Sequence, residues 1–148
     1  MMRLNPTGLL MIALAACGSF HPGPALAQDQ SEPEKIDCGY PLTQMEMTYC
    51  AGEAFKQADA ELNQVYSEAM RAMQSLDEGL TGSGLEGAAD ALREAQRAWV
   101  PFRDKACISQ GFMARGGSME PMLVVGCKAT LTQQRIEDLK NLAEGLGN

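Results

Sequence analysis

The stretch that decides the fold is Gln96-Arg97-Ala98-Trp99-Val100-Pro101-Phe102-Arg103-Asp104-Lys105-Ala106-Cys107. It contains the only tryptophan of the chain, an interior proline, a cluster of opposite charges and a cysteine. At helical spacing, one face carries the apolar side chains Leu92, Ala95, Trp99, Phe102 and Ala106. Gln96 and Arg103 lie along the edge of this face. An apolar anchor, Trp99, is therefore flanked by polar groups that need partners on other helices.

Two further helices are predicted, one on each side of this stretch. Thr43 and Glu46 have the spacing of a capping box, and the helix that begins there runs to about Leu76. Its apolar stripe recurs at intervals of three and four residues and consists of Phe55, Ala58, Leu62, Val65, Ala69, Met73 and Leu76. The face of the middle helix also includes Leu85 and Ala88. The last helix begins near Pro121 or Met122, and its face carries Leu123, Cys127, Leu131, Arg135, Leu139 and Leu142.

The segments between these helices, 77–84 and 109–121, are rich in turn-forming residues. No segment alternates with a period of two for long enough to indicate a strand. We therefore predict an all-α protein, an antiparallel bundle of three main helices, with one folded domain spanning residues 38–146.

The first 27 residues have the pattern of a secretory signal peptide. Arg3 precedes an apolar run, and Ala25-Leu26-Ala27 is a small-residue cleavage site. The run is too short to span a membrane, and no other stretch qualifies. Residues 28–37 form a polar leader that we expect to be disordered. The alternative is lipidation, because Leu14-Ala15-Ala16-Cys17 resembles a lipoprotein box and Cys17 would then carry a lipid anchor. Either route predicts a periplasmic or secreted protein.

The chain is acidic, with a formal net charge of −7 at pH 7. Removing residues 1–27 takes away Arg3 and no acidic residue, which makes the charge −8. Such a protein repels nucleic acid and anionic membranes and attracts a cationic partner. Nucleic-acid binding is therefore excluded from the functions we consider.

Four cysteines follow the signal segment, and an even count in an exported chain indicates two disulfides. Three connectivities are possible. We favour Cys38–Cys50 and Cys107–Cys127, because each bond closes a short loop across a predicted turn. Zinc is the alternative for four cysteines, but no two of them are close enough in sequence to form a typical ligand pair. We therefore expect neither a metal nor a cofactor.

The sequence offers little that would support catalysis. The chain has one histidine, His21, and it lies in the signal segment. Serine–histidine and cysteine–histidine nucleophile pairs are therefore excluded from the mature protein. We predict that the protein is not an enzyme.

The polar residues near the helical seams have two interpretations. They are Asp59, Asn63 and Tyr66 on the first helix, Gln96 and Arg103 on the second, and Arg135 on the third. The first interpretation is an inter-helix network that satisfies buried polar groups and sets the register of the bundle. The second is direct contact with a partner. Trp99 is likewise predicted to be a core anchor, with a binding platform as the alternative.

Several spaced blocks of sequence between about residues 38 and 142 together match the pattern of a known family. They are Cys50, Ala58-Asp59-Ala60-Glu61-Leu62-Asn63-x-x-Tyr66, Ala95-Gln96-Arg97-Ala98-Trp99, Phe102-Arg103-Asp104, Cys107, Gly117-Ser118, Cys127, Thr132, Arg135 and Leu139. This pattern resembles the LprI-type lysozyme inhibitor family of small exported bacterial helical proteins. The resemblance implies a helical fold and, as function, inhibition of lysozyme or another cationic muramidase.

The loop at 109–121 is the candidate partner-binding element. If Cys107 pairs with Cys127, the loop is closed at its base and projects Phe112, Met113 and Arg115. A muramidase cleft uses paired carboxylates, which an inserted arginine would satisfy. The alternative is that this loop only connects two helices and binds no partner. The alternative function is an accessory envelope protein that binds another periplasmic component through its helical faces.

Overall fold

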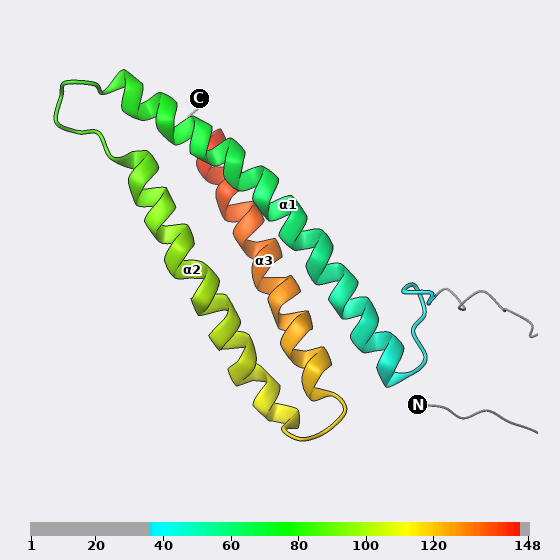
Figure 1. The fold of residues 1–148 in the computed structure, drawn as a ribbon. Helices are drawn as coiled ribbons and strands as arrows, with labels where there is room; N and C mark the ends of the chain where they lie inside the picture. The colour runs from blue at the N-terminus through cyan, green and yellow to red at the C-terminus, as the bar shows by residue number, and fades with distance from the viewer. Residues whose placement is uncertain (1–35, 146–148) are drawn as a thin grey trace, which may run out of the picture. The chain divides into compact units, whose positions relative to one another are not determined.

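A computed structural model describes residues 36–145 and contains three long helices (Figure 1). They are α1 (Gln44–Gly79), α2 (Ala88–Gly111) and α3 (Glu120–Glu144), and a short 3-10 helix, η1 (Phe112–Ala114), follows α2. No strand occurs within these described residues. The prediction of an all-α bundle of three main helices with two disulfides is confirmed. The predicted signal segment, Cys17 and the leader as far as residue 35 lie outside the described part of the chain.

Helix α3 lies between the other two and packs against both, whereas α1 and α2 contact each other less (Figure 1). α2 runs antiparallel to α1 and α3. The buried apolar side chains come from all three helices: Ala58, Leu62, Val65, Ala69, Met73, Ala89, Leu92, Ile136 and Leu139. Burying such side chains is the main driving force for folding. Five residues of the stripe predicted on α1 belong to this core, while Phe55 is half-buried and Leu76 is exposed.

The start of α1 is set by the predicted capping box. The Thr43 hydroxyl accepts a hydrogen bond from the backbone N–H of Glu46, and the Glu46 carboxylate accepts from the N–H groups of Thr43 and Leu42 at 2.9 and 2.7 Å. The hydrogen bonds from Thr43 and Leu42 hold the pKa of Glu46 below its ordinary value. The N-terminus of α1 therefore begins where the sequence indicated.

Both disulfides lie at one end of the bundle, which we call the disulfide end. Cys38–Cys50 ties the segment before α1 to its second turn, and Cys107–Cys127 joins α2 to α3. The connection from α2 to α3 lies at the same end, whereas residues 80–87 connect α1 to α2 at the opposite end. The favoured pairing of the four cysteines is confirmed. If a disulfide acts by lowering the conformational entropy of the unfolded chain, closing a loop with a sequence separation of 12 or 20 stabilises the fold by about 3 kcal/mol.

The prediction of which side of α2 faces the core is wrong, because the helix is rotated about its axis relative to the predicted orientation. Its buried residues are Ala89, Leu92, Arg103, Cys107 and Gly111. Of the predicted face, Leu92 is buried, Ala95 and Phe102 are exposed, and Leu85 is exposed and lies before the helix. The rotation follows from two constraints on the α2–α3 contact. Cys107 must face Cys127, and a Cβ at Gly111 would lie 2.5 Å from a methyl group of Val124. Only glycine allows this close approach, so α2 turns the Cys107 and Gly111 side inward.

The faces predicted for α3 and its preceding loop also need correction. Thr132, Ile136 and Leu139 are buried, whereas Leu142 is exposed and Leu131 is only partly covered. α3 is apolar on more than one side, and α1 and α2 together cover a different side from the predicted one. The predicted loop 109–121 is shorter, because α2 continues to Gly111, η1 follows and α3 begins at Glu120.

The start of α2 has a cap that sequence analysis missed. Asp77, in the last turns of α1, accepts hydrogen bonds from the backbone N–H groups of Gly87, Ala88 and Ala89 at 2.8, 2.8 and 3.0 Å. Those hydrogen bonds, from Ala89 foremost, hold the pKa of Asp77 below its ordinary value of 3.8. A side chain of α1 therefore does what an N-cap residue of α2 would do.

We expect Asp77→Ala to lower the melting temperature by about 5 °C at neutral pH, because three N–H groups lose their acceptor. The pKa of Asp77 is lower in the folded than in the unfolded chain, so the stabilisation is present above pH 3.8 and lost as the pH falls below it. The difference in melting temperature between wild type and Asp77→Ala should therefore shrink in acid. Glu78→Ala removes the same charge from an exposed neighbour and serves as the control. Equal melting temperatures for both variants would contradict the capping role.

Candidate functional site

The connection between α2 and α3 is an ordered, exposed element. Phe112 and Met113 lie in η1 with 57% and 82% of their surface exposed. The guanidinium of Arg115 stacks over the Phe112 ring at 4.6 Å from the ring centroid. Large apolar side chains at such exposure gain nothing from folding, so they are available to a partner.

Glu120, the first residue of α3, makes two contacts that hold this connection in place. Its carboxylate pairs with Arg115 and accepts a hydrogen bond from the backbone N–H of Gly116 at 2.8 Å. The Gly116 hydrogen bond and then the Arg115 contacts hold the pKa of Glu120 below its ordinary value. Gly116 has a φ of 77°, which glycine tolerates best. Arg115 is therefore prepositioned, and an incoming carboxylate has to compete with Glu120 for it.

Sequence analysis missed Glu120, although a signal was present. Arg115 and Glu120 have opposite charges and flank a tight turn that contains Gly116 and Gly117. Opposite charges on either side of such a turn lie close enough to pair. The base of the connection is held by the bond between Cys107, which is completely buried, and Cys127.

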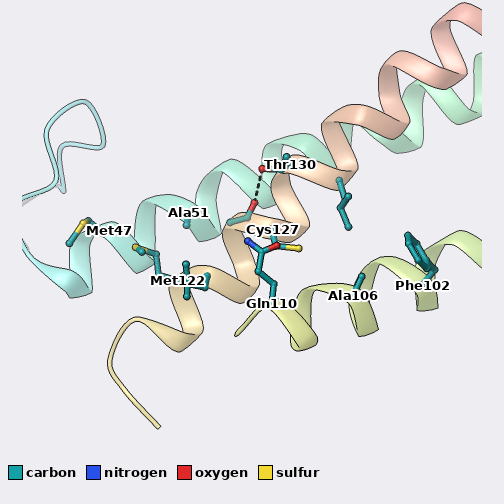
Figure 2. Close-up of a pocket in the computed structure, with 11 residues that line it drawn as sticks. Met47, Ala51, Phe102, Ala106, Gln110, Met122, Cys127 and Thr130 are labelled. Carbon is teal, nitrogen blue, oxygen red and sulfur yellow. Dashed lines mark hydrogen bonds between the residues drawn. The ribbon is translucent and has the colours of Figure 1, made fainter. Parts of the chain in front are cut away.

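The bundle also carries an apolar groove beside this connection (Figure 2). All three helices line it, among them Met47 and Ala51 of α1, Phe102 and Ala106 of α2, and Leu123 and Leu131 of α3. Its volume is about 500 Å³, and no charged side chain belongs to the lining. Residues that the sequence placed in the core, such as Phe102, Ala106 and Leu131, thus form a surface groove. We call this feature the apolar groove.

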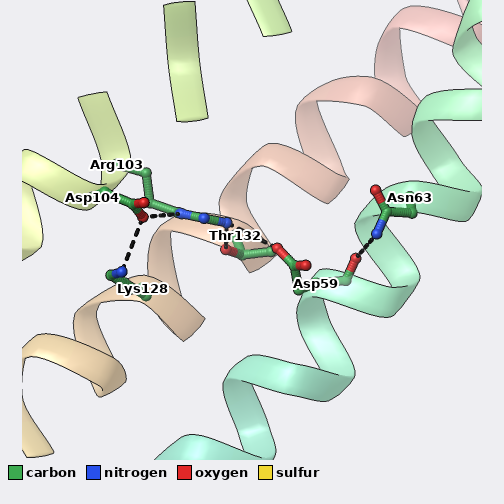
Figure 3. Close-up of polar contacts among 6 residues, drawn as sticks. All are labelled: Asp59, Asn63, Arg103, Asp104, Lys128 and Thr132. Carbon is green, nitrogen blue, oxygen red and sulfur yellow. Dashed lines mark hydrogen bonds and ion pairs between the residues drawn. The ribbon is translucent and has the colours of Figure 1, made fainter. Parts of the chain in front are cut away.

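Arg103 lies at the centre of a polar cluster that connects all three helices (Figure 3). Only 6% of its surface is exposed. Its guanidinium donates to Asp59 of α1 at 3.0 Å, to Asp104 of α2 at 3.0 Å and to the Thr132 hydroxyl of α3 at 3.3 Å. Lys128 contacts the same Asp104 oxygen at 3.2 Å. The buried cation is therefore neutralised and hydrogen-bonded.

Two aromatic rings complete the surroundings of Arg103. The guanidinium carbon lies 5.0 Å from the centroid of the Phe55 ring and 5.2 Å from that of Trp99. Trp99 is partly buried and packs against the core, so it lies at the margin of the core rather than at its centre. Burial raises the pKa of Asp104, but the contacts with Lys128 and Arg103 outweigh it and keep this pKa low.

The other predicted network residues do not all join this cluster. Arg135 of α3 donates to Gln96 of α2 at 3.0 Å and makes a second polar link between these helices. Asn63 is exposed and donates to the Asp59 carbonyl oxygen of its own helix. Tyr66 packs against the apolar core. The expectation that Asn63 links helices is therefore wrong, because its side chain points along α1 instead of across the seam.

Two kinds of feature are absent from the described residues. Among residues 36–145 there is no group of three or more histidine, cysteine, aspartate or glutamate side chains that would hold a metal ion. Within the same range, no helix is both long and apolar enough to cross a membrane. What the disulfide end does present is an exposed apolar connection, a stacked arginine and a groove.

These features define a disulfide-bonded helical bundle with an exposed connection and an apolar groove in the half that holds the disulfides. The sequence matches the family described as lysozyme inhibitor LprI over residues 38–139, and the chain belongs to this family. It is also 48% identical over 127 residues to an uncharacterized protein of Rhizobium meliloti (strain 1021), a match that covers 84% of this chain and 88% of that protein. No solved structure matches the chain significantly. The family and the two disulfides indicate a location outside the cytoplasm.

We expect Arg103→Ala to lower the free energy of unfolding by about 2 to 3 kcal/mol, because Asp59 and Asp104 lose their shared cation and the ring contacts disappear. Arg103→Lys should restore little, since an ammonium cannot bridge both carboxylates in one plane. Chemical denaturation measures both changes. Arg97→Ala, on the exposed side of α2, should stay within about 0.5 kcal/mol of wild type. Wild-type stability of Arg103→Ala would disprove the structural role.

Proposed function

We propose that the protein is an exported inhibitor of lysozyme or another cationic muramidase. Membership of the LprI family supports a lysozyme-type partner. The observation that carries the proposal is the exposed connection of Phe112, Met113 and Arg115, which the Cys107–Cys127 bond braces at its base.

In this proposal the connection enters the enzyme's cleft. A glycosidase cleft holds two carboxyl groups a few ångströms apart, and arginine is the side chain best suited to bind them. Arg115 is 63% exposed and is already held in place by Glu120 and the Phe112 ring. A preorganised side chain loses little conformational entropy on binding. Phe112 and Met113 would cover apolar subsites beside the carboxylates.

Charge assists the encounter between inhibitor and enzyme. Without residues 1–27 the net charge is 11 minus 19, or −8, which would attract a basic enzyme over distances longer than any contact. Steering of this kind weakens as salt rises, because the Debye length falls to about 8 Å at physiological ionic strength. The proposal therefore has two separable parts, long-range attraction by the whole chain and insertion of Arg115.

The proposed protein is periplasmic or secreted. A signal segment at 1–27, a leader at 28–37 and a folded domain at 38–146 are the proposed divisions of the chain. A lipid anchor at Cys17 is the alternative form of the same exported protein. We propose no enzymatic activity, no cofactor and no bound metal.

The second candidate is an accessory envelope protein that binds another periplasmic component through its helical faces. The apolar groove favours it, because soluble proteins seldom leave apolar surface of three helices open to water. Under this candidate, a folded and oxidised sample inhibits no lysozyme.

We expect Arg115→Ala to raise the inhibition constant against a cationic lysozyme by about tenfold or more, because the cleft carboxylates lose their partner. Lysis of cell walls, measured at low and moderate salt, supplies the inhibition constant. The matched control is Arg71→Ala, which removes the same charge from an exposed site in the second half of α1. A sample with reduced disulfides tests whether inhibition requires the Cys107–Cys127 bond at the base of the connection.

The possible results separate the parts of the proposal. Equal inhibition by Arg115→Ala and Arg71→Ala would remove the insertion mechanism and leave charge steering. Absence of inhibition by the wild-type protein against several lysozymes would remove the inhibitor function and favour the accessory protein.

A further inference from the structure

A second group of exposed apolar side chains lies before and at the start of α1. Tyr40 is 74% exposed, and Leu42 and Met45 are each 72% exposed. We call these three residues the N-terminal patch. A single exposed apolar residue is common on a protein surface, but three within six consecutive positions need an explanation.

The backbone that carries the N-terminal patch is fixed by several bonds. The disulfide at Cys38 ties it to α1. The backbone N–H of Tyr40 donates to the carbonyl oxygen of Asp37 at 3.2 Å, and the N–H of Leu42 donates to the Glu46 carboxylate at 2.7 Å. Side chains on a fixed backbone lose less conformational entropy when a partner covers them than side chains on a flexible loop. The patch is therefore preorganised for binding.

The N-terminal patch lies beside the connection between α2 and α3. Figure 1 shows the start of α1 and this connection at the same end of the bundle. The side-chain amide of Gln44, the first residue of α1, donates to the sulfur of Met122 in the first turn of α3 at 3.4 Å. Met119, the last residue of the connection, precedes Met122 by about one helical turn and is exposed. The start of α1 therefore adjoins the α3 end of the connection.

The connection alone is too small to hold a protein partner. It has eight residues, 112–119, because α2 ends at Gly111 and α3 begins at Glu120. A stable protein–protein interface uses about 20 to 30 residues on each side and buries about 800 Å² of each partner. An arginine that enters an enzyme's cleft therefore needs a second surface beside it. Projecting side chains such as Tyr40 and Leu42 can meet the rim of a cleft, whereas the apolar groove is recessed.

We propose that the N-terminal patch is a second contact surface for the same enzyme, binding the rim of the cleft while Arg115 binds the carboxylates inside it. This inference rests on the proposed function. The patch contains no charged residue, so it contributes by burying apolar and aromatic surface. Tyr40 offers a large ring together with a hydroxyl that can bond to the partner. The partner surface that fits the patch is therefore an uncharged, partly apolar rim.

An uncharged contact surface has a kinetic signature that differs from charge steering. Steering by net charge raises the association rate constant and depends on salt. Loss of a packed contact changes mainly the dissociation rate constant. Substitutions in the N-terminal patch should therefore speed dissociation and leave association unchanged.

Binding of the purified, oxidised protein to an immobilised cationic lysozyme, together with inhibition of cell-wall lysis, tests the inference. We expect Tyr40→Ala and Leu42→Ala each to raise the dissociation rate constant and the inhibition constant by about fivefold to tenfold. The matched control is Leu85→Ala, which removes the same side chain as Leu42→Ala at the same 72% exposure but at the opposite end of the bundle. This control should bind like wild type.

Helical circular dichroism and a thermal melt accompany each variant, and because Tyr40 and Leu42 are mostly exposed, their loss leaves the core intact. Wild-type kinetics for both patch variants, with inhibition still weakened by Arg115→Ala, overturn the inference and leave the proposed function standing. An equal effect of Leu85→Ala also overturns it, because the effect is then not local to the patch. A wild-type protein that neither binds nor inhibits any of several lysozymes overturns the proposed function and this inference together.

Discussion

The burial of the Arg103 charge is the constraint on which the rest of the structure depends. An unpaired guanidinium inside a bundle would cost several kcal/mol, so every helix supplies something to neutralise it. α1 provides Asp59, α2 provides Asp104, and α3 provides the Thr132 hydroxyl. The pairing of this cation adds to the Cys107–Cys127 bond and the close approach at Gly111, and together they fix how far α2 is rotated. With Arg103 facing inward, Phe102 lies about 100° further around α2, where it is exposed and lines the apolar groove.

The two ends of the bundle are stabilised by different means. At the disulfide end, Cys107–Cys127 joins α2 to α3 and Cys38–Cys50 ties the segment before α1 to α1, while Phe112 and Met113 are exposed there. At the other end, hydrogen bonds from Gly87, Ala88 and Ala89 to Asp77 join α1 to α2. Most of the large exposed apolar side chains lie toward the disulfide end, although Leu76, Leu85 and Leu142 are exposed toward the other end.

The disulfide end carries two surfaces suited to different partners. The connection with Arg115 combines a cation with exposed apolar side chains, which is the combination that our proposal uses for a cleft lined by carboxylates. The apolar groove has no charge and matches a surface that is also uncharged. Both surfaces depend on the contact between α2 and α3, which Cys107–Cys127 and the small size of Gly111 keep close. One packing arrangement thus positions both surfaces.

Local sequence alone determined the helices, the capping box at Thr43 and Glu46 and the stripe on α1, and it favoured the pairing of the cysteines that the structure has. These features depend on residues close together in the chain, where spacing and turn chemistry are decisive. Tertiary structure decided which sides of α2 and α3 face inward, and hence that Phe102 and Leu131 line a groove while Thr132 and Ile136 are buried. It also decided that Asp77 caps α2 and that Asn63 stays outside the polar cluster. Both helices are apolar on more than one side, so only the simultaneous pairing of Arg103 and the close approach at Gly111 select one rotation.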